Sequence, residues 1–499
     1  MILRINGNVK PYYAETLAMI FFPGAKFPEN EEETPETVVA TVELCESDGT
    51  ANAVVTLKQG EKTTKGTSSQ PLTGDTDKRR KIAVGEAFMK AGKDFTGVTP
   101  PWGILTGVRP AKVASELFRK GYGEDGAAEE ISREYFVSPI KSRLAVDVAA
   151  AEARIITDGI RRECSVYVGI PFCPTRCAYC SFVSYTSKKL LSLIPDYLSA
   201  LCEDIDGVFS VIRSLGMKVS TVYIGGGTPT VLTVDEMRVL LSKIREHTSD
   251  LTEFTCEAGR PDTITAEKLR VAAEYGVDRI SVNPQTLNDE VLKGIGRAHT
   301  TDMFYSAYAT ARESGIKNIN VDLIAGLPYD TTESFMRSID GVIALDPENI
   351  TVHTFSVKRS SEFKTEGRFD PASVIAAESV DYSQKRLRES GYLPYYMYRQ
   401  KNTVGNQENV GYAKPGHEGL YNIYMMEEVH SIFAAGAGSV TKLVSLPDSD
   451  GNVRIERLFQ PKYPYEYLGG YKNGESAKKL DEMKKTAAEF FADKDRNGH

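Results

Sequence analysis

Three cysteines in one short loop are the residues of this chain best suited to chemistry. Cys173, Cys177 and Cys180 have the spacing Cys-x3-Cys-x2-Cys and follow an apolar segment that ends in Ile-Pro-Phe. Thiolates are soft ligands, and zinc normally takes four protein ligands, or three and a water. A cubane [4Fe–4S] cluster usually takes four cysteines. The three cysteines therefore predict a cluster with one iron open to a small molecule, with zinc or three structural cysteines as the alternatives.

A run of glycines follows the next apolar segment. Residues 225–230 read Gly-Gly-Gly-Thr-Pro-Thr. Consecutive glycines let a ligand approach the backbone closely. The run lacks the Lys-Ser/Thr ending of a phosphate-binding P-loop. By itself it indicates either a tight turn or a ligand-binding loop.

Polar side chains close three further apolar segments. Glu257, Gln285 and Asp322 each end such a segment. A buried carboxylate is costly without a partner, so each residue alone has a structural hydrogen bond or an ion pair as its simplest explanation. Three at equivalent positions are better explained by a polar ligand with amine, ribose and carboxylate groups. Arg297 is suited to pair with a carboxylate through two parallel hydrogen bonds.

A second group of charges lies late in the chain, among aromatic residues. Cations beside aromatic faces suit a flat ligand with several carboxylates, although a solvated edge strand explains them equally well. Gly436 and Gly438 are predicted to close the substrate side, and His353 and His430 are predicted to be structural. The candidate cations are Lys358, Arg359, Arg399 and Lys401.

Alternation of strand-like and helix-like segments positions these residues. Six βα units are predicted from about residue 165, and regular βα repetition indicates a parallel sheet with outer helices. Six units predict an incomplete barrel, in which chemistry lies in loops after the carboxyl ends of the strands. The cysteine loop and the glycine run both fall there. The predicted strands are 165–170, 221–224, 253–256, 279–282, 319–324 and 350–355.

The first 160 residues have a different pattern. Short strands are predicted at 1–6, 38–44 and 53–57, and the polar stretch 59–80 is predicted to be a mobile loop. Helical periodicity then predicts helices at 81–95, 111–119, 127–135 and 140–156. These helices raise the alternative of a DNA-reading helix-turn-helix. Acidic residues offset the basic ones there, which disfavours nucleic acid.

Composition limits the class of protein further. The 499 residues are 41% hydrophobic and 26% charged, as in an ordinary globular protein with two or three domains. A net charge of −8 disfavours binding to nucleic acid. Seven cysteines without a paired framework indicate a reducing compartment. No signal-peptide pattern or membrane-length apolar run is visible, so the expectation is a cytoplasmic protein without a membrane partner.

Together these segments resemble the oxygen-independent coproporphyrinogen III oxidase family of radical S-adenosylmethionine (SAM) proteins, over about residues 160–440. Within that family they resemble the HemZ branch, called coproporphyrinogen dehydrogenase. The branch-specific cues are the segments 105–110, Leu-Thr-Gly-Val-Arg-Pro, and 395–402, Tyr-Tyr-Met-Tyr-Arg-Gln-Lys-Asn. The family also contains HemW-type haem chaperones and haem-degrading methyltransferases.

The resemblance implies a [4Fe–4S] cluster and SAM as cofactors. Cys173, Cys177 and Cys180 match the residues that hold the cluster. Tyr167, Gly226 and Glu257 match the contacts of the cluster-bound SAM. The oxidases use a second SAM molecule, and the matching positions are Tyr179, Gly227, Thr228, Gln285, Arg297 and Asp322.

The resemblance also implies an activity: oxidative decarboxylation of the propionates of coproporphyrinogen III to vinyl groups, giving protoporphyrinogen IX. It implies an electron donor such as flavodoxin or ferredoxin. Two departures from the family bear on this. The oxidases have a fourth cysteine where this chain has Phe182, whereas the haem motif of the chaperones is also missing. A haem chaperone and a SAM-dependent haem-degrading methyltransferase are therefore the alternatives.

The expected fold is α/β: an incomplete (β/α)6 radical SAM barrel with an N-terminal α+β domain and a short C-terminal extension. The expected domains are 1–160, the accessory domain; 161–360, the radical SAM core; and 361–499, an extension that closes the substrate side.

Overall fold

The computed structural model describes residues 1–28, 30–107, 109–180, 184–356, 374–400, 403–448 and 451–492. These residues form two compact units. The first contains residues 1–150 and, later in the chain, 397–400 and 403–408; nearly all the rest belongs to the second. No helix in the described ranges is both long and apolar enough to cross a membrane.

The first unit is built on a four-stranded sheet. Its strands are β1 (Ile2–Asn6), β2 (Val39–Ser47), β3 (Thr50–Gln59) and β4 (Lys62–Pro71), in that spatial order. β1 is parallel to β2, and the other pairs are antiparallel. Every second residue of β3 from Ala51 to Leu57 is buried, as the period of two requires for a sheet covered on one face.

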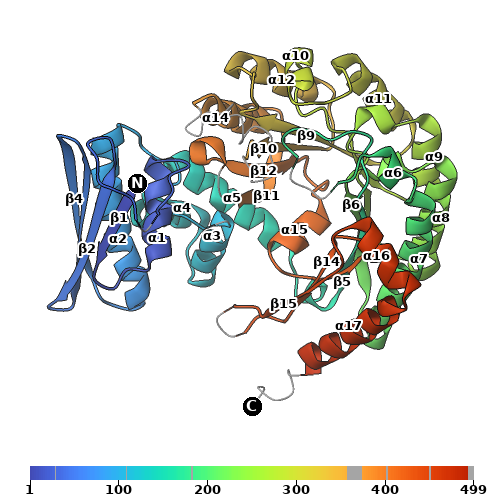
Figure 1. Ribbon diagram of the computed structural model, residues 1–499, viewed down its shortest axis with the longest axis horizontal. Helices are drawn as coiled ribbons and strands as arrows, with labels where there is room; N and C mark the ends of the chain where they lie inside the picture. Colours follow the sequence, from blue (N-terminus) through green and yellow to red (C-terminus); the bar gives the residue numbers. More distant parts are fainter. Residues whose placement is uncertain are drawn as a thin grey trace. The chain divides into compact units, whose positions relative to one another are not determined.

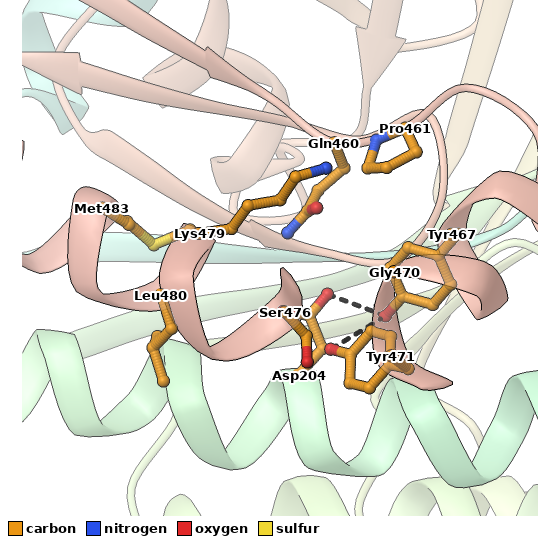
Figure 2. Close-up of a pocket in the computed structure, with 10 residues that line it drawn as sticks. All are labelled: Asp204, Gln460, Pro461, Tyr467, Gly470, Tyr471, Ser476, Lys479, Leu480 and Met483. Carbon is orange, nitrogen blue, oxygen red and sulfur yellow. Dashed lines mark hydrogen bonds between the residues drawn. The ribbon is translucent and has the colours of Figure 1, made fainter. Parts of the chain in front are cut away.

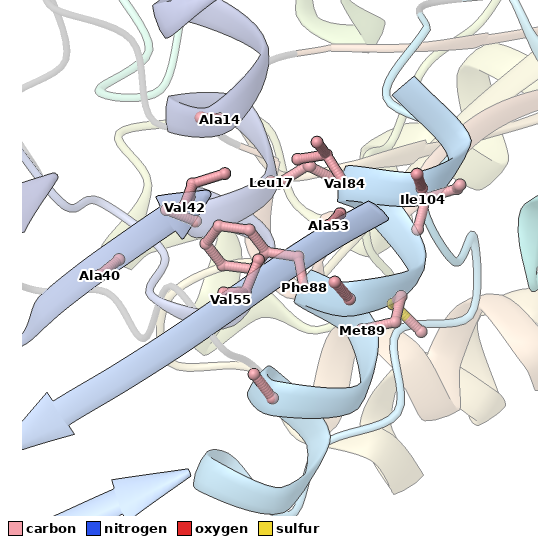
Figure 3. Packing of buried hydrophobic residues seen from close by; sticks show 14 of the residues in the cluster. Ala14, Leu17, Ala40, Val42, Ala53, Val55, Val84, Phe88, Met89 and Ile104 are labelled. Atoms are coloured by element: carbon pink, nitrogen blue, oxygen red, sulfur yellow. The ribbon is translucent and has the colours of Figure 1, made fainter. Parts of the chain in front are cut away.

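Two helices supply the other half of this core, α1 (Pro11–Phe21) and α2 (Thr76–Thr96). Figure 3 shows Leu17 of α1 and Phe88 of α2 packed with Val42 and Val55 of the sheet. The first unit continues with α3 (Pro110–Arg119), α4 (Glu124–Tyr135) and α5 (Pro139–Ile155), close to the predicted helices.

The prediction of a mobile loop at 59–80 is wrong. The segment forms β4 and the start of α2. Gly60, with φ of +56°, makes the tight turn that returns the chain beside β3. Gly66 faces α2 so closely that a β-carbon would collide with the carbonyl group of Ala87. Threonine favours strands, and tertiary packing on α2 orders this polar segment despite its lack of apolar residues.

The second sheet contains eleven strands in the order β11-β12-β10-β9-β8-β7-β6-β5-β13-β14-β15. The six predicted βα strands lie consecutively in its middle, all parallel. The order begins at β11 and ends at β15, so the sheet is an open barrel within the described residues, as predicted. The six strands are β5 (Cys164–Ile170), β6 (Val219–Gly226), β7 (Glu253–Cys256), β8 (Arg279–Ser281), β9 (Asn318–Ala325) and β10 (Asn349–Thr354).

Helices connect and cover these strands, as the green to yellow part of Figure 1 shows. Apolar positions repeat along each helix, so one face is buried against the sheet. In α7, for example, Leu198, Leu201 and Ile205 are all buried. The helices are α6 (Lys188–Leu191), α7 (Ile194–Ser214), α8 (Val234–His247), α9 (Ala266–Glu274), α10 (Asp289–Gly294), α11 (Thr301–Glu313), α12 (Thr332–Ala344) and α14 (Val374–Glu389).

The C-terminal region extends both ends of this sheet. β12 (Glu408–Ala413) is antiparallel to β10, and β13 (Ser431–Ala435) is parallel to β5. The other elements are β11 (Leu393–Arg399), α15 (Leu420–Met426), β14 (Val440–Val444), β15 (Ile455–Phe459), α16 (Pro464–Lys472) and α17 (Glu475–Ala492).

A buried carboxylate joins α7 to α16 and to the segment that follows β13. Oδ2 of Asp204 accepts hydrogen bonds from the Gly436 amide and the Tyr467 hydroxyl, both at 2.8 Å. Figure 2 shows Asp204, Tyr467 and Tyr471 pointing toward one another in a pocket beside α17. Burial raises the pKa of Asp204, and these two donors offset part of the cost.

Candidate functional site

The cysteine loop is held at both ends. The Cys173 amide donates to the Tyr185 carbonyl at 3.1 Å, and the Tyr185 amide returns a bond to Pro171 at 2.9 Å. Farther along, the Ala178 amide donates to the Ile295 carbonyl, just after α10, at 3.1 Å. Backbone hydrogen bonds therefore fix this loop at the carboxyl end of β5, where the barrel arrangement predicts chemistry.

The spacing of the cysteine sulfurs argues against a single bound ion. In a tetrahedral zinc site, Zn–S bonds of about 2.3 Å place the sulfurs roughly 3.8 Å apart. Within the described residues, one group of three or more His, Cys, Asp or Glu donors lies mutually within 4.8 Å, and it contains none of the three cysteines. The three cysteine sulfurs are therefore not drawn together as the ligands of one ion in this structure.

The glycine run lies directly against the cysteine loop. The Gly227 amide donates to the Ile170 carbonyl at 2.7 Å, and Thr228 Oγ1 lies 3.3 Å from Cys173 Sγ. A β-carbon on Gly227 would lie 2.9 Å from the same sulfur and even closer to the Phe172 carbonyl. Gly226 has φ of +112°, which only glycine adopts readily. The end of β6 is therefore built for close approach to the cysteine loop.

Glu257 lies beside the same glycines, inside the barrel. It receives a short hydrogen bond from the Tyr223 hydroxyl. A β-carbon on Gly225 would lie 3.1 Å from its Oε2. Burial raises the pKa of Glu257 to about 7; the Tyr223 hydrogen bond lowers it, whereas the nearby charge of Asp322 raises it. Burial disfavours the charged form of this carboxyl group, and a nearby cation stabilises that form. The site therefore suits a cationic partner, such as the amino group of an amino-acid ligand.

An aromatic stack supports Glu257, and the sequence reasoning overlooked most of it. The ring of Tyr223 lies between Tyr167 and Tyr421, with centroid distances of 6.3 and 4.5 Å. Tyr223 and Gly225 are two residues apart on β6 and therefore share a face, which is the signal that the sequence offered. Tyr421, from α15, carried no comparable signal.

Asp322 is held in a polar layer of the barrel. Its two oxygens accept hydrogen bonds from the Asn283 and Asn320 side-chain amides, at 2.8 and 2.7 Å. Gln285 lies alongside. Its backbone N–H donates to the backbone carbonyl of Asp322 at 3.1 Å, and its φ is +71°. A positive φ in a residue other than glycine stores strain, which occurs most often at ligand sites.

The two predicted structural histidines differ. His430 is buried, with Nδ1 2.9 Å from Ser165 Oγ and Nε2 2.9 Å from the Ile160 carbonyl, which confirms a structural role. His353 has its Nε2 3.7 Å from Asp322 Oδ2, so it lies in the polar layer and not in an isolated structural setting.

Arg297 and Tyr179 come together as a pair. Nε of Arg297 donates to the Tyr179 hydroxyl at 3.1 Å, and Nη1 donates to the Gly259 carbonyl at 3.4 Å. The pair joins the cysteine loop to the segment after α10. The sequence reasoning missed Arg260, whose Nη1 lies 3.7 Å from Cys177 Sγ. Only its place in the loop after β7 could have signalled it.

One of the four predicted substrate cations, Arg399, lies in the described part of the chain. Lys358, Arg359 and Lys401 lie outside the described residues. Arg399 is buried in the first unit, where it donates to the Leu105 carbonyl and to Asn406 Oδ1 and lies 5.4 Å from the ring centre of Trp102. These contacts engage the two terminal nitrogens of the guanidinium, whereas the buried Nε has no hydrogen-bond partner in the described part of the chain. The assignment of Arg399 to a substrate carboxylate therefore stays a prediction.

Comparison with known proteins agrees with this geometry. The model of the radical SAM superfamily matches residues 167–341. The oxygen-independent coproporphyrinogen-III oxidase-like protein HemZ of Bacillus subtilis is 39% identical over 402 residues, which cover 78% of each chain. The chain belongs to this oxidase-like family of radical SAM proteins. It is also similar to the haem chaperone HemW of Bacillus subtilis, at 32% identity over 55% of this chain and 70% of the chaperone.

The chain is also similar to the solved structure of the Escherichia coli coproporphyrinogen III oxidase HemN, described as a radical SAM enzyme. That structure is 22% identical and matches with a TM-score of 0.49, over 65% of this chain and 72% of its own. Radical SAM proteins use a [4Fe–4S] cluster and SAM. The three cysteines of one loop, the close approach at Gly227 and the carboxyl group of Glu257 fit these cofactors.

Stability without cofactors is expected to depend on pH through Glu257. Because the pKa of Glu257 is about 7 in the folded state, against 4.5 for a glutamate in the unfolded chain, the native state binds the proton more tightly. Stability should therefore fall as the pH rises from about 4.5 to 7, by on the order of 3 kcal/mol. Glu257→Gln, which stays neutral, should lose this dependence. Urea midpoints at pH 5 and pH 8 measure the effect, and parallel profiles for the variant and the wild type would contradict it.

Proposed function

We propose that the chain catalyses the oxidative decarboxylation of coproporphyrinogen III propionates, giving protoporphyrinogen IX. For each propionate, one hydrogen atom is removed from the β-carbon, the carboxylate carbon leaves as carbon dioxide, and one electron passes to an acceptor, so that a vinyl group remains. Bound cluster and SAM supply the 5′-deoxyadenosyl radical that takes the hydrogen atom, after one electron arrives from a donor such as flavodoxin or ferredoxin.

The extent of the similarity carries this proposal. The match to the oxidase-like relative covers 78% of the chain, whereas the match to the chaperone of the same organism covers 55%. Such a match spans more than the radical SAM segment at 167–341. A role shared with the oxidase-like protein therefore accounts for more of the chain than the chaperone role does.

The residues of the barrel interior receive roles under this proposal. The cluster is held by Cys173, Cys177 and Cys180. Tyr167, Gly226 and Glu257 bind the cluster-bound SAM, with Glu257 facing its amino group. Tyr179, Gly227, Thr228, Gln285, Arg297 and Asp322 bind a second SAM. Glu257 accepts a hydrogen bond from the Tyr223 hydroxyl and Asp322 accepts one from the Asn283 side-chain amide, so both carboxyl groups are held in place for a bound ligand.

The second candidate is a haem chaperone. HemW of Bacillus subtilis is 32% identical to the chain, and Phe182 stands where the oxidases of the family have a fourth cysteine. A chaperone binds haem without decarboxylating a propionate.

The test is anaerobic reconstitution with iron and sulfide, followed by SAM, a low-potential reductant and coproporphyrinogen III. Mass spectrometry of the tetrapyrrole should show loss of carbon dioxide and two hydrogens at each converted propionate, with 5′-deoxyadenosine formed in step. A parallel incubation with haem measures retention after gel filtration. Stoichiometric haem retention without any vinyl product would replace the oxidase proposal with the chaperone role.

A further inference from the structure

A buried arginine, Arg260, points at one of the cluster cysteines. It lies in the loop that follows β7, three residues after Glu257, and is 3% exposed. Its Nη1 lies 3.7 Å from Cys177 Sγ, a hydrogen-bond length for sulfur, and 3.2 Å from the Thr175 carbonyl. One nitrogen of the guanidinium therefore contacts the cysteine loop through both a sulfur and a backbone oxygen.

The other edge of the guanidinium is held by Asp262. Nε and Nη2 of Arg260 donate to the two carboxylate oxygens at 3.0 and 3.1 Å, a parallel pair of bonds that fixes the plane of the group. Asp262 lies on the far edge from Cys177. The ion pair is thus oriented, with its positive end toward the sulfur and its negative end away from it.

This orientation has an electrostatic consequence for a cluster bound to Cys177. One-electron reduction of a [4Fe–4S] cluster adds a negative charge. Hydrogen bonds to the ligand sulfurs and nearby positive charges stabilise the reduced form and raise the reduction potential. A guanidinium in a buried site acts more strongly than one in water, because the local dielectric is lower. The carboxylate of Asp262, on the other side of the guanidinium, lowers the reduction potential, but it acts from a greater distance.

We propose that the Arg260–Asp262 pair sets the reduction potential of the cluster, with Arg260 raising it through Cys177 and Asp262 limiting the increase. Both act as positioning residues through the ligand and do not take part in the reaction themselves. The proposal rests on the cluster and is independent of the tetrapyrrole substrate, so failure of the decarboxylation assay leaves it standing.

The test uses the reconstituted full-length protein without substrate. Its cluster is titrated with dithionite, a low-potential one-electron donor, through viologen mediators, and the reduced cluster is followed by electron paramagnetic resonance. Arg260→Gln should disfavour reduction about tenfold, which is roughly a 59 mV fall for a one-electron couple. Asp262→Asn should shift the potential upward, since it leaves the guanidinium without its countercharge.

Two further variants complete the design. Arg260→Lys keeps the positive charge but loses the two parallel hydrogen bonds to Asp262, so it should shift the potential less than Arg260→Gln. It also replaces the glutamine variant if that variant does not fold. Arg312→Gln removes the arginine of another ion pair in the same unit, 2.7 Å from Glu348, and should leave the potential unchanged. Iron and sulfide content, measured for each variant, shows that the cluster is complete.

Opposite shifts in Arg260→Gln and Asp262→Asn support the proposal, because a purely structural role for the loop does not predict opposite signs. Unchanged potentials, or shifts in the same direction with complete clusters, overturn it. SAM affinity, measured separately by equilibrium binding, distinguishes a third outcome. A fall in SAM affinity with an unchanged potential would assign Arg260 to SAM and would also overturn the proposal.

Discussion

Cys177→Ala is expected to abolish the [4Fe–4S] cluster and, with it, all cleavage of SAM. Cys177 is 9% exposed and follows Cys173 by four residues on a loop tied to β5 and to the end of α10. Only three cysteines form the motif, so the loss of one leaves two protein ligands for a cluster that usually takes four. The reconstituted variant should lack the broad visible absorption of the cluster and the signal of the reduced cubane, and it should form no 5′-deoxyadenosine.

Cys45→Ala is the matched control. Cys45 is exposed and lies on β2 of the first unit, so its loss should leave iron content and SAM cleavage at wild-type levels. A complete cubane signal in Cys177→Ala would refute the ligand assignment.

Gly227→Ala is expected to reduce cluster assembly and SAM cleavage at least tenfold, although it adds a single methyl group. That methyl would lie 2.9 Å from Cys173 Sγ and closer still to the Phe172 carbonyl. The amide of Gly227 is bonded to Ile170 at 2.7 Å, so the backbone cannot move away without breaking the contact between β6 and β5. Iron content and initial rates of 5′-deoxyadenosine formation measure the effect.

Gly259→Ala makes the same change in a nearby loop of the barrel. Its methyl would lie 3.5 Å from Asn283 Nδ2, an ordinary van der Waals contact, so wild-type iron content and rates are expected. Equal losses of iron content and activity in the two variants would contradict the prediction. They would show that an added methyl group is harmful in both loops, and not only beside the cysteine loop.

The elements predicted best from the sequence are those that show a periodic pattern of apolar residues. β5 to β10 alternate with helices, and each predicted strand lies within a few residues of the observed one. β4 was missed because its order comes from the hairpin at Gly60 and from α2, which lies on Gly66. β13 was also missed, because its partner is more than 250 residues away in sequence. Pairing at that distance leaves no periodic trace.

The candidate site, too, contains residues that the strand pattern predicted and residues that were missed. Glu257 directly follows β7, and topology alone brings strand ends together at one edge, whereas Asp322, which was predicted to end its strand, lies within β9. Arg260 and Tyr421 come from irregular segments, whose side-chain directions depend on the path of the backbone in three dimensions. For Arg399, composition indicated a cation among aromatic rings, but only the fold shows that Trp102 is one of these rings.

The pairing of β13 with β5 has a consequence for the synthesis of the chain. Ser431 pairs with Cys164, so 267 residues separate the two partners. At about 5–20 residues per second, a ribosome needs roughly 13–53 s to deliver the second strand after the first. During that interval β5, the strand that leads into the cysteine loop, lacks its native neighbour on one side. β5 therefore gains its neighbour on that side only after residues 431–435 have been synthesised, long after the cysteine loop itself has left the ribosome.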